Sequence, residues 1–474
     1  MPQGLATSAE LESGSDGVDS HETSRPSSSL LRNLIVSSIC GNLLEWYDFG
    51  IFASFSEEIS EAFFTGGRLE ELLKVYGVFA VAFFARPLGG FLLGLIGDRY
   101  GRTLSLQISV VAMGASALVI SVLPTNSIAP YAIGPAATVL LVLARIVQGL
   151  SVGGEMVGSM LFMVENVPES WKCLVSCVPM AAAISGTGTG YLVSTIITAA
   201  VSEEARVVWG WRLAFALGVP AGAVGFMFRS CLSESHSFTT AIERFMVRNK
   251  NQHPFTFALK HEPLAFFVLS SLSMILCGYY SATIWYNEAW LEVFYTELVE
   301  DGLSELQGRL LNTLLIFMGL AGGLLAMAVI IDRGPKMPLH RYIFVSTGLL
   351  TVLTPVFLWL MSFGRRCYLC VAAGQLAGML CLAPAVAPLT LYLTSQMPAQ
   401  LQYTGIGLSY NIGLALFGGT LPYVATAIDV RSSWVIAPGF YLSALALLGF
   451  ASVGLGELPV VRGMREDLAR RMNA

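Results

Sequence analysis

Two carboxylates stand three residues apart in an apolar stretch near the start of the chain. Glu45 and Asp48 belong to the segment GNLLEWYDFG, and this spacing places them on nearly the same helix face, about one turn apart. Two close carboxylates repel each other, which favours protonation of one of them. We therefore predict a proton-carrying site. The simpler alternative is a structural charge pair with Arg86 or Arg145.

A second polar set lies further along, in the segment RIVQGLSVGGE. Gln148 and Glu155 are seven residues apart and share one helix stripe, with Arg145 about one turn from Gln148. Arg145 either tunes the carboxylates electrostatically or joins neighbouring helices, and it can do both. The predicted proton-coupling residues are Glu45, Asp48 and Glu155, and their predicted charge partners are Arg86 and Arg145.

Aromatic and amide side chains in the apolar stretches predict a solute cavity. Aromatic residues near a membrane boundary usually anchor the span. The alternative is a cage that binds a quaternary ammonium group by cation–π attraction. The predicted cavity residues are Asn42, Gln148, Tyr280, Trp285, Glu288 and Asn411. No histidine falls in an apolar stretch and no cluster has metal-ligand spacing, so we expect no metal, no cofactor and no catalytic residue.

The elements that must position these side chains are membrane spans. Of the 474 residues, 54% are hydrophobic and 12% are charged, whereas soluble proteins are about 45–50% apolar and about 25% charged. This excludes a soluble enzyme, a nucleic-acid-binding protein and a disordered scaffold. About twelve apolar stretches reach the roughly 20 residues that a crossing helix needs. We predict an all-α membrane protein with twelve transmembrane helices in two six-helix halves.

A charged interruption separates the two halves. The predicted units are a disordered N-terminal tail (1–31), a first bundle (32–229), a linker (230–262), a second bundle (263–456) and a C-terminal tail (457–474). Lys and Arg concentrate on alternate connections, which places both termini and the linker in the cytoplasm. We expect a multi-pass protein of the plasma membrane.

The loop between the second and third spans has the pattern G-x-x-x-D-R-x-G-R, starting at Gly94. Opposed charges in a short glycine-containing turn join neighbouring helix ends, and Asp98 can cap the helix that follows. A degraded copy, Asp332-Arg333-Gly334-Pro335, follows the eighth span. The predicted conformational gate comprises Gly94, Asp98, Arg99, Gly101, Arg102, Asp332 and Arg333.

These loops resemble the signature of the major facilitator superfamily. GNLLEWYDF, RIVQGLSVGGE and the segment from WRLAF to Arg229-x-x-Leu232-x-Glu234-Ser235 are similar to the metabolite:proton symporter family. That family includes proline/betaine, α-ketoglutarate, citrate and shikimate transporters. One departure is Gln402, which stands where the family usually has a basic residue before Tyr403-Thr404-Gly405. The resemblance implies two six-helix bundles around a central cavity, with transport by alternating access.

The charge balance of the spans favours a zwitterion as the solute. Several cations are needed to bury a di- or tricarboxylate, and only Arg86 and Arg145 fall within spans. We predict a secondary active transporter, not an enzyme, that performs proton-coupled symport of a solute such as proline or betaine. The alternatives are an organic-acid symporter of the same family, an uncoupled facilitator and a non-transporting nutrient sensor. The expected partners are the solute, protons and the bilayer, without nucleic acid, and the chain is expected to function as a monomer.

Overall fold

The computed structural model describes residues 28–473, apart from residues 101, 127–132, 166, 231–253, 286–304, 363–367, 433 and 435. Every named element in these ranges is a helix, which confirms the all-α prediction. Within the described residues, ten helices are long and apolar enough to cross a membrane. The two other predicted spans are also helical and pack in the same bundle. They are α1 (Ser28–Ser54) and the segment formed by α19 (Gln402–Gly413) and α20 (Leu421–Ser432).

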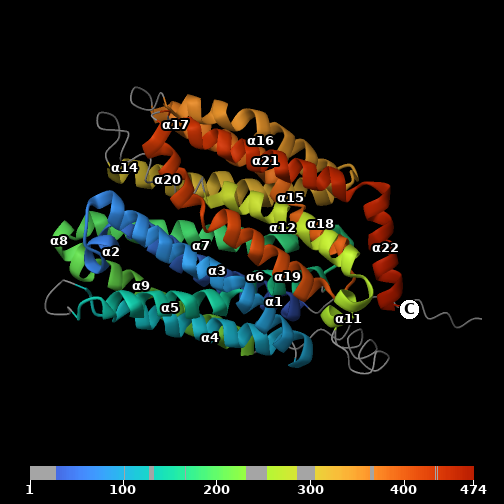
Figure 1. Ribbon diagram of the computed structural model, residues 1–474, viewed down its shortest axis with the longest axis horizontal. Helices are drawn as coiled ribbons and strands as arrows, with labels where there is room; N and C mark the ends of the chain where they lie inside the picture. The colour runs from blue at the N-terminus through green and yellow to red at the C-terminus, as the bar shows by residue number, and fades with distance from the viewer. Residues whose placement is uncertain are drawn as a thin grey trace, which may run out of the picture.

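The first half of the chain forms one set of packed helices, coloured blue to green in Figure 1. Besides α1 it contains α2 (Ser56–Phe63), α3 (Arg68–Tyr100), α4 (Arg102–Ser121), α5 (Ala136–Val152), α6 (Glu155–Glu165), α7 (Lys172–Ala200), α8 (Glu203–Ala205) and α9 (Trp211–Ser230), with the π-helical turn η2 (Arg206–Gly210) before α9. The most extensive packing joins α1 to α7, α3 to α5, and α4 to α9.

The second half repeats this arrangement in yellow to red (Figure 1). It contains α12 (Pro263–Trp285), α14 (Glu305–Leu315), α15 (Gly322–Arg333), α16 (Leu339–Ser362), α17 (Tyr368–Val386), α18 (Leu389–Gln396), α19, α20 and α21 (Ala437–Gly456), with the π-helical turns η4 (Ile316–Ala321) and η6 (Leu414–Gly418). Here α12 packs on α19, α15 on α17, and α16 on α21. These pairs correspond in chain order to the three pairs of the first half.

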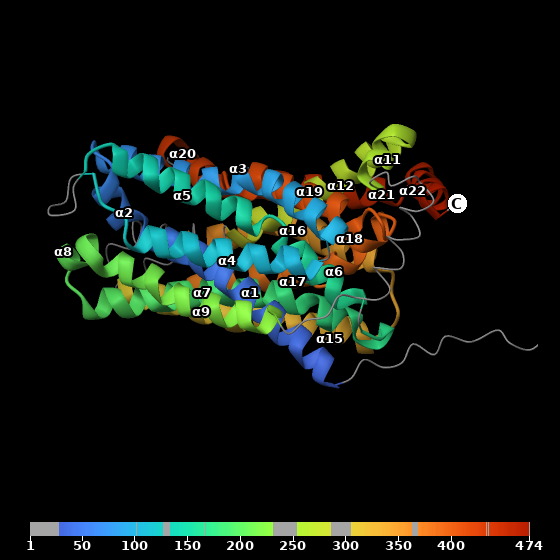
Figure 2. The ribbon, with the colours of Figure 1, turned by 90° about the horizontal axis from the view of Figure 1, so that it is seen from below.

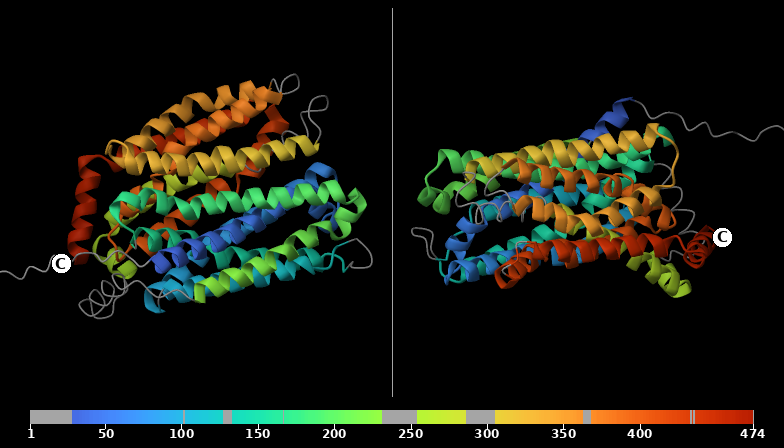
Figure 3. Two further views of the ribbon diagram at one scale, coloured as in Figure 1. Left: turned by 180° about the vertical axis from the view of Figure 1, so that it is seen from behind. Right: turned by 90° about the horizontal axis from the view of Figure 1, so that it is seen from above.

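The two halves meet along two seams. In one, α7 packs against α14, η4 and α15; in the other, α3 and α6 pack against α19. Figure 3 shows the halves side by side from behind. The fourth span of each half is interrupted, at Gly153–Gly154 between α5 and α6, and at Ala387–Pro388 between α17 and α18.

Two helices form outside the predicted bundles, at one end of the molecule (Figure 2). These are α11 (Pro254–His261), in the predicted linker, and α22 (Pro459–Asn473), in the predicted C-terminal tail. Leu468 and Met472 of α22 are buried, and α22 packs against α11 and α12. We call this the terminal end of the bundle. At the N-terminal boundary of the first predicted bundle, α1 begins at Ser28, inside the segment predicted as a tail (1–31).

Glycines in α5 and directly after it bring this helix into backbone contact with α3. A Cβ atom added at Gly149 would collide with the carbonyl of Ala82, and one added at Gly153 would collide with the backbone at Arg86. Only small residues allow two helices to approach this closely. The close approach sets Arg86 of α3 and Arg145 of α5 side by side against α1.

Candidate functional site

Two buried ion pairs join α1 to its neighbours in the first half. Glu45 Oε1 lies 2.6 Å from Arg86 Nη2, and Asp48 Oδ2 lies 3.2 Å from Arg145 Nη1. No side chain of the four is more than 3% exposed. The structure therefore brings the two acids of α1 together with both predicted charge partners, and gives each acid its own arginine.

The amide of Gln148 completes the second of these pairs. It donates a hydrogen bond to the Asp48 carboxylate and accepts one from the Arg145 guanidinium. Because Gln148 follows Arg145 by three residues on α5, one helix face supplies both groups. This predicted cavity residue is thus part of the charged cluster.

Aromatic rings surround both guanidinium groups. Arg86 Cζ lies 5.5 Å from the ring centroids of Trp46 and Phe83, and Arg145 Cζ lies 4.2 Å from that of Phe52. The ring of Phe49 serves both groups, at 5.6 Å from Arg86 and 4.8 Å from Arg145. Cation–π contacts stabilise a cation that has been removed from water. These rings were not predictable from the sequence, because aromatic residues are common in membrane spans.

The two ion pairs leave polar atoms unused. Within the described part of the chain, Glu45 Oε2, Arg86 Nη1 and Arg145 Nη2 are buried and have no hydrogen-bond partner. A guanidinium binds carboxylates through two parallel N–H donors, and each arginine still has donors available. The arrangement is therefore suited to binding a carboxylate.

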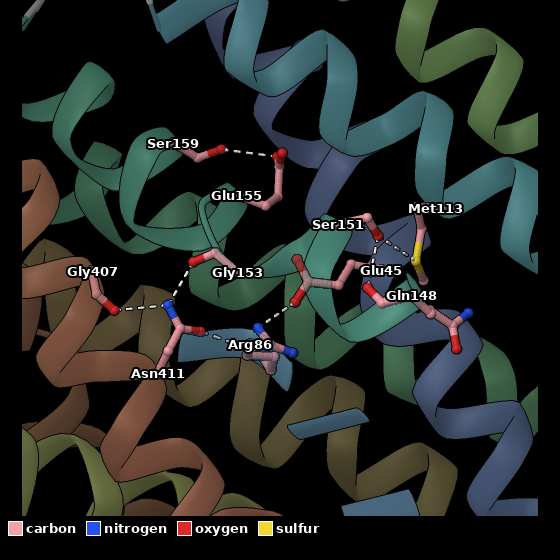
Figure 4. A network of polar contacts seen from close by, with 10 residues as sticks. All are labelled: Glu45, Arg86, Met113, Gln148, Ser151, Gly153, Glu155, Ser159, Gly407 and Asn411. Atoms are coloured by element: carbon pink, nitrogen blue, oxygen red, sulfur yellow. Dashed lines mark hydrogen bonds and ion pairs between the residues drawn. The ribbon is translucent and has the colours of Figure 1, made fainter. Parts of the chain in front are cut away.

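One amide of the second half reaches this charged site. Arg86 Nε donates to Asn411 Oδ1 at 3.3 Å, and Asn411 Nδ2 donates to the carbonyls of Gly153, at 2.5 Å, and Gly407, at 2.7 Å. Figure 4 shows Asn411 between these three partners. The predicted cavity residue Asn411 thus connects α19 to both α3 and the α5–α6 break.

The third predicted acid, Glu155, pairs with an arginine that was not among the predicted charge partners. Its carboxylate forms an ion pair with Arg229, the two side chains being 2% and 1% exposed. Arg229 also donates to the carbonyl of Leu106 at 2.6 Å, and Ser159 donates to Glu155 at 3.2 Å. In Figure 4 Glu155 lies apart from the Glu45–Arg86 contact. The only available signal was the similarity of the segment around Arg229 to the symporter family.

The other predicted cavity residues are distributed differently. Asn42 donates to the carbonyl of Ser38 in its own helix at 2.9 Å. Tyr280 is buried, and its ring centroid lies 6.1 Å from that of Tyr410. The side chain of Trp285 and the whole of Glu288 lie outside the described residues.

The gate residues are described only in part. The carboxylate of Asp332 accepts hydrogen bonds from the backbone N–H groups of Cys173 and Leu174 in the other half. Gly94 is buried, with Thr404 of α19 next to it, and Arg333 is exposed. Gly101 and the side chains of Asp98, Arg99 and Arg102 lie outside the described residues.

Buried charge in the described spans is confined to the first half. Three buried acids, Glu45, Asp48 and Glu155, face three buried arginines, Arg86, Arg145 and Arg229. Among the residues described for the second half, no charged side chain is buried. That half contributes neutral polar groups, such as the pair in which Gln375 Nε2 donates to Asn312 Oδ1 at 2.6 Å. No group of three or more potential metal ligands occurs in the described ranges.

Comparison with known proteins shows that the chain is similar to membrane transporters. Residues 34–250 match the family model for sugar (and other) transporters. The chain is 27% identical over 426 residues to the glycine betaine/proline/ectoine/pipecolic acid transporter OusA of Dickeya dadantii, covering 88% of this chain and 82% of the relative. It is also 27% identical over 441 residues to a proline/betaine transporter of Salmonella typhimurium, with the same two coverages.

A solved structure supports the same fold. The proton:xylose symporter XylE superimposes with a TM-score of 0.72 at 17% sequence identity, over 90% of this chain and 95% of that chain. At this identity the likeness is evidence for the fold. Together with the paired six-helix halves, it shows that this chain has the fold of the major facilitator superfamily, and the sequence relatives to which it is similar are membrane transporters.

Proposed function

We propose that this transporter performs proton-coupled symport of a small zwitterionic solute of the proline/betaine class. The observation that carries the proposal is the pair of buried contacts, Glu45–Arg86 and Asp48–Arg145. The names of the two relatives support the solute class. Proton-coupling roles for these acids and for Glu155, and cavity roles for the polar residues beside them, belong to this proposal.

Buried ion pairs give a physical reason for coupling proton and solute. Neutralising one acid leaves its arginine as an uncompensated buried charge, which costs about 3–5 kcal/mol. A solute carboxylate can replace the protonated acid as the partner of that arginine. Proton and solute then favour each other's binding, because each removes the penalty that the other creates.

The same electrostatics favours a zwitterion. The buried acids and arginines balance in the described spans, so the site tolerates a solute without net charge best. A dicarboxylate would bring a second negative charge for which the described second half has no buried cation, and an unpaired buried charge is costly. The ammonium group of a zwitterion can be stabilised by aromatic faces, such as those of Tyr280 and Tyr410.

Alternating access follows if the bundles 32–229 and 263–456 move as two bodies around this site. We place both termini and the linker 230–262 on the cytoplasmic side of the plasma membrane, because most Lys and Arg residues outside the spans lie on that side. The terminal end is then the cytoplasmic gate. The bundle acts as a monomer in this proposal.

Uptake by proteoliposomes tests the proposal. We expect an inward proton gradient to drive accumulation of labelled glycine betaine or proline, and citrate and α-ketoglutarate not to compete. The E45Q, D48N and E155Q variants should each lose accumulation while exchange persists. The matched control is E70Q, which removes an acid from an exposed pair with Lys74 and should transport normally.

The outcomes separate the alternatives. Competition by dicarboxylates but not by zwitterions would identify an organic-acid symporter. Uptake that ignores the proton gradient would identify a facilitator, and the absence of uptake of every solute would favour a sensor. If all three amide variants accumulate solute normally, the acids are structural and the coupling assignment is wrong.

A further inference from the structure

Two side chains of α19 bind consecutive carbonyls at the break between α5 and α6. Asn411 Nδ2 lies 2.5 Å from the carbonyl oxygen of Gly153, and the Tyr403 hydroxyl lies 3.2 Å from that of Gly154. Both contacts cross between the two halves of the transporter. They join the halves at the seam where α19 meets α3 and α6.

Asn411 uses its whole amide in these contacts. One N–H binds Gly153 and the other binds Gly407 of its own helix, while Oδ1 accepts from Arg86 Nε at 3.3 Å. The side chain is fully buried. Gly90 provides the room, because a Cβ atom there would lie 2.8 Å from Asn411 Nδ2. A carboxamide has two N–H donors and one acceptor oxygen, so it can make all three contacts at once.

Arg86 connects this amide to a carboxylate. Its Nη2 lies 2.6 Å from Glu45 Oε1, and its Nε points at Asn411. A guanidinium is planar and rigid, so the contact with Glu45 fixes the direction in which Nε points. Two further ion pairs surround the Glu45–Arg86 pair. Asp48 and Arg145 lie beside it, and Glu155 and Arg229 lie towards the terminal end. On the side of the second half, the hydroxyl groups of Tyr280 and Tyr410 lie close enough to Arg86 to interact with its charge.

We propose that Asn411 is a positioning residue that transmits the charge state of Glu45 to the seam between the halves. The ionised carboxylate orients Arg86, Arg86 orients the Asn411 amide, and the amide holds the carbonyl of Gly153. When Glu45 becomes neutral, the guanidinium of Arg86 turns away, and Asn411 Oδ1 loses the hydrogen bond that it accepts from Arg86 Nε. The seam then opens more readily. This inference rests on the alternating access and the proton site of the proposed function.

Two cysteines on the other seam report its opening. Cys173 and Cys177 of α7 are 0% and 1% exposed, and their thiols donate to the carbonyl of Ala387 across the seam, at 3.5 and 3.1 Å. A maleimide can reach the two thiols only when the halves separate at the terminal end. Serine at Cys40, Cys231, Cys277, Cys367, Cys370 and Cys381 leaves these two thiols as the reporters.

A double-mutant cycle tests the inference in the full-length protein. In that background, E45Q mimics the neutral acid and should raise the maleimide reaction rate at least about twofold, as expected for coupled neighbours. N411L removes both hydrogen-bonding functions and should raise the rate by itself. The double variant should react no faster than N411L. The matched control is S409A, since Ser409 is buried on the same helix but donates only to the carbonyl of Gly405.

A second variant covers the case in which N411L does not fold. N411D keeps the shape and the acceptor for Arg86 but cannot donate to Gly153, so its seam should open readily and ignore E45Q. Equal effects of E45Q with and without Asn411, or no effect of E45Q at all, would overturn the inference. The measurement needs neither solute nor gradient. Failure of zwitterion uptake therefore removes the proposed function alone, and additive labelling removes this inference alone.

Discussion

The carboxylate of Asp332 accepts a hydrogen bond from the backbone N–H of Leu174, at 2.8 Å, and thereby caps a helix that belongs to the other half of the chain. The N–H of Cys173 binds the same carboxylate at 3.1 Å. These donors lie at the N-terminus of α7, where free N–H groups and the helix dipole both favour an anion. The second copy of the loop motif therefore fastens the two halves together.

Removing this cap should loosen the terminal end. Hydrogen bonds to a charged group contribute about 1.5–3 kcal/mol each, so D332A should increase the fraction of open molecules about tenfold or more. The measurement is the maleimide reaction rate of Cys173 and Cys177. D467N is the control, because Asp467 pairs with Arg470 on an exposed face of α22. An unchanged rate in D332A would mean that the cap does not restrain the gate.

Removing one member of a buried ion pair should lower the free energy of unfolding more than removing both members. D48N leaves Arg145 uncompensated, and we expect the free energy of unfolding to fall by about 3–5 kcal/mol. The double variant D48N/R145Q should recover part of that loss. Thermal unfolding of the detergent-purified protein measures both. Equal melting temperatures for the single and double variants would show that the pair does not interact.

The backbone contact between α3 and α5 predicts a sharp difference between two glycines. In G149A the new methyl group meets the carbonyl of Ala82, and overpacking of this kind costs about 1–3 kcal/mol. In G77A the methyl group meets no atom within 4 Å, and alanine improves helix propensity. We expect a lower melting temperature and less transport for G149A only. Similar behaviour of the two variants would contradict the close packing.

The C-terminal helix α22 is held by few contacts, and one substitution should release it from the bundle. Leu468 is 0% exposed and Met472 is 2% exposed, while Arg471 Nε lies 2.6 Å from Glu262 Oε1. An acid at a buried apolar position is costly to desolvate, so L468D should release α22. Faster tryptic cleavage after Arg470 and Arg471 would report the release. E466D, on the exposed face of the same helix, should cleave at the wild-type rate.

Much of the architecture was predictable from local properties of the sequence. Hydropathy and length identify the spans, and the spacing of Glu45 and Asp48 places both on one face of α1. Arg86 and Arg145 were predicted as partners because they are cations in spans whose burial requires a counter-charge. Which arginine pairs with which acid depends on helix packing, and the structure supplied that assignment.

The remainder of the site depends on contacts that no single segment specifies. Arg229 ends α9 next to a charged connection, so its position in the sequence is typical of a cytoplasmic anchor. In the fold, its guanidinium packs over Gly41, where a Cβ atom would collide with it, and reaches Glu155. That burial requires α1, α4, α6 and α9 together. The boundaries of α11 and α22 were not predicted, because α11 has only eight residues and α22 is rich in charged residues, so neither resembles a membrane span.

The neutrality of each buried ion pair has an electrical consequence. Moving one elementary charge through a membrane voltage of 100 mV involves about 2.3 kcal/mol. Under the proposed mechanism, the empty carrier with its ion pairs closed has no net charge at these sites, and its return step does no work against the voltage. Under the proposed mechanism, the carrier with a protonated acid and a bound zwitterion has one extra positive charge. A voltage that is negative inside the cell therefore drives the loaded carrier inward and leaves the return of the empty carrier unaffected.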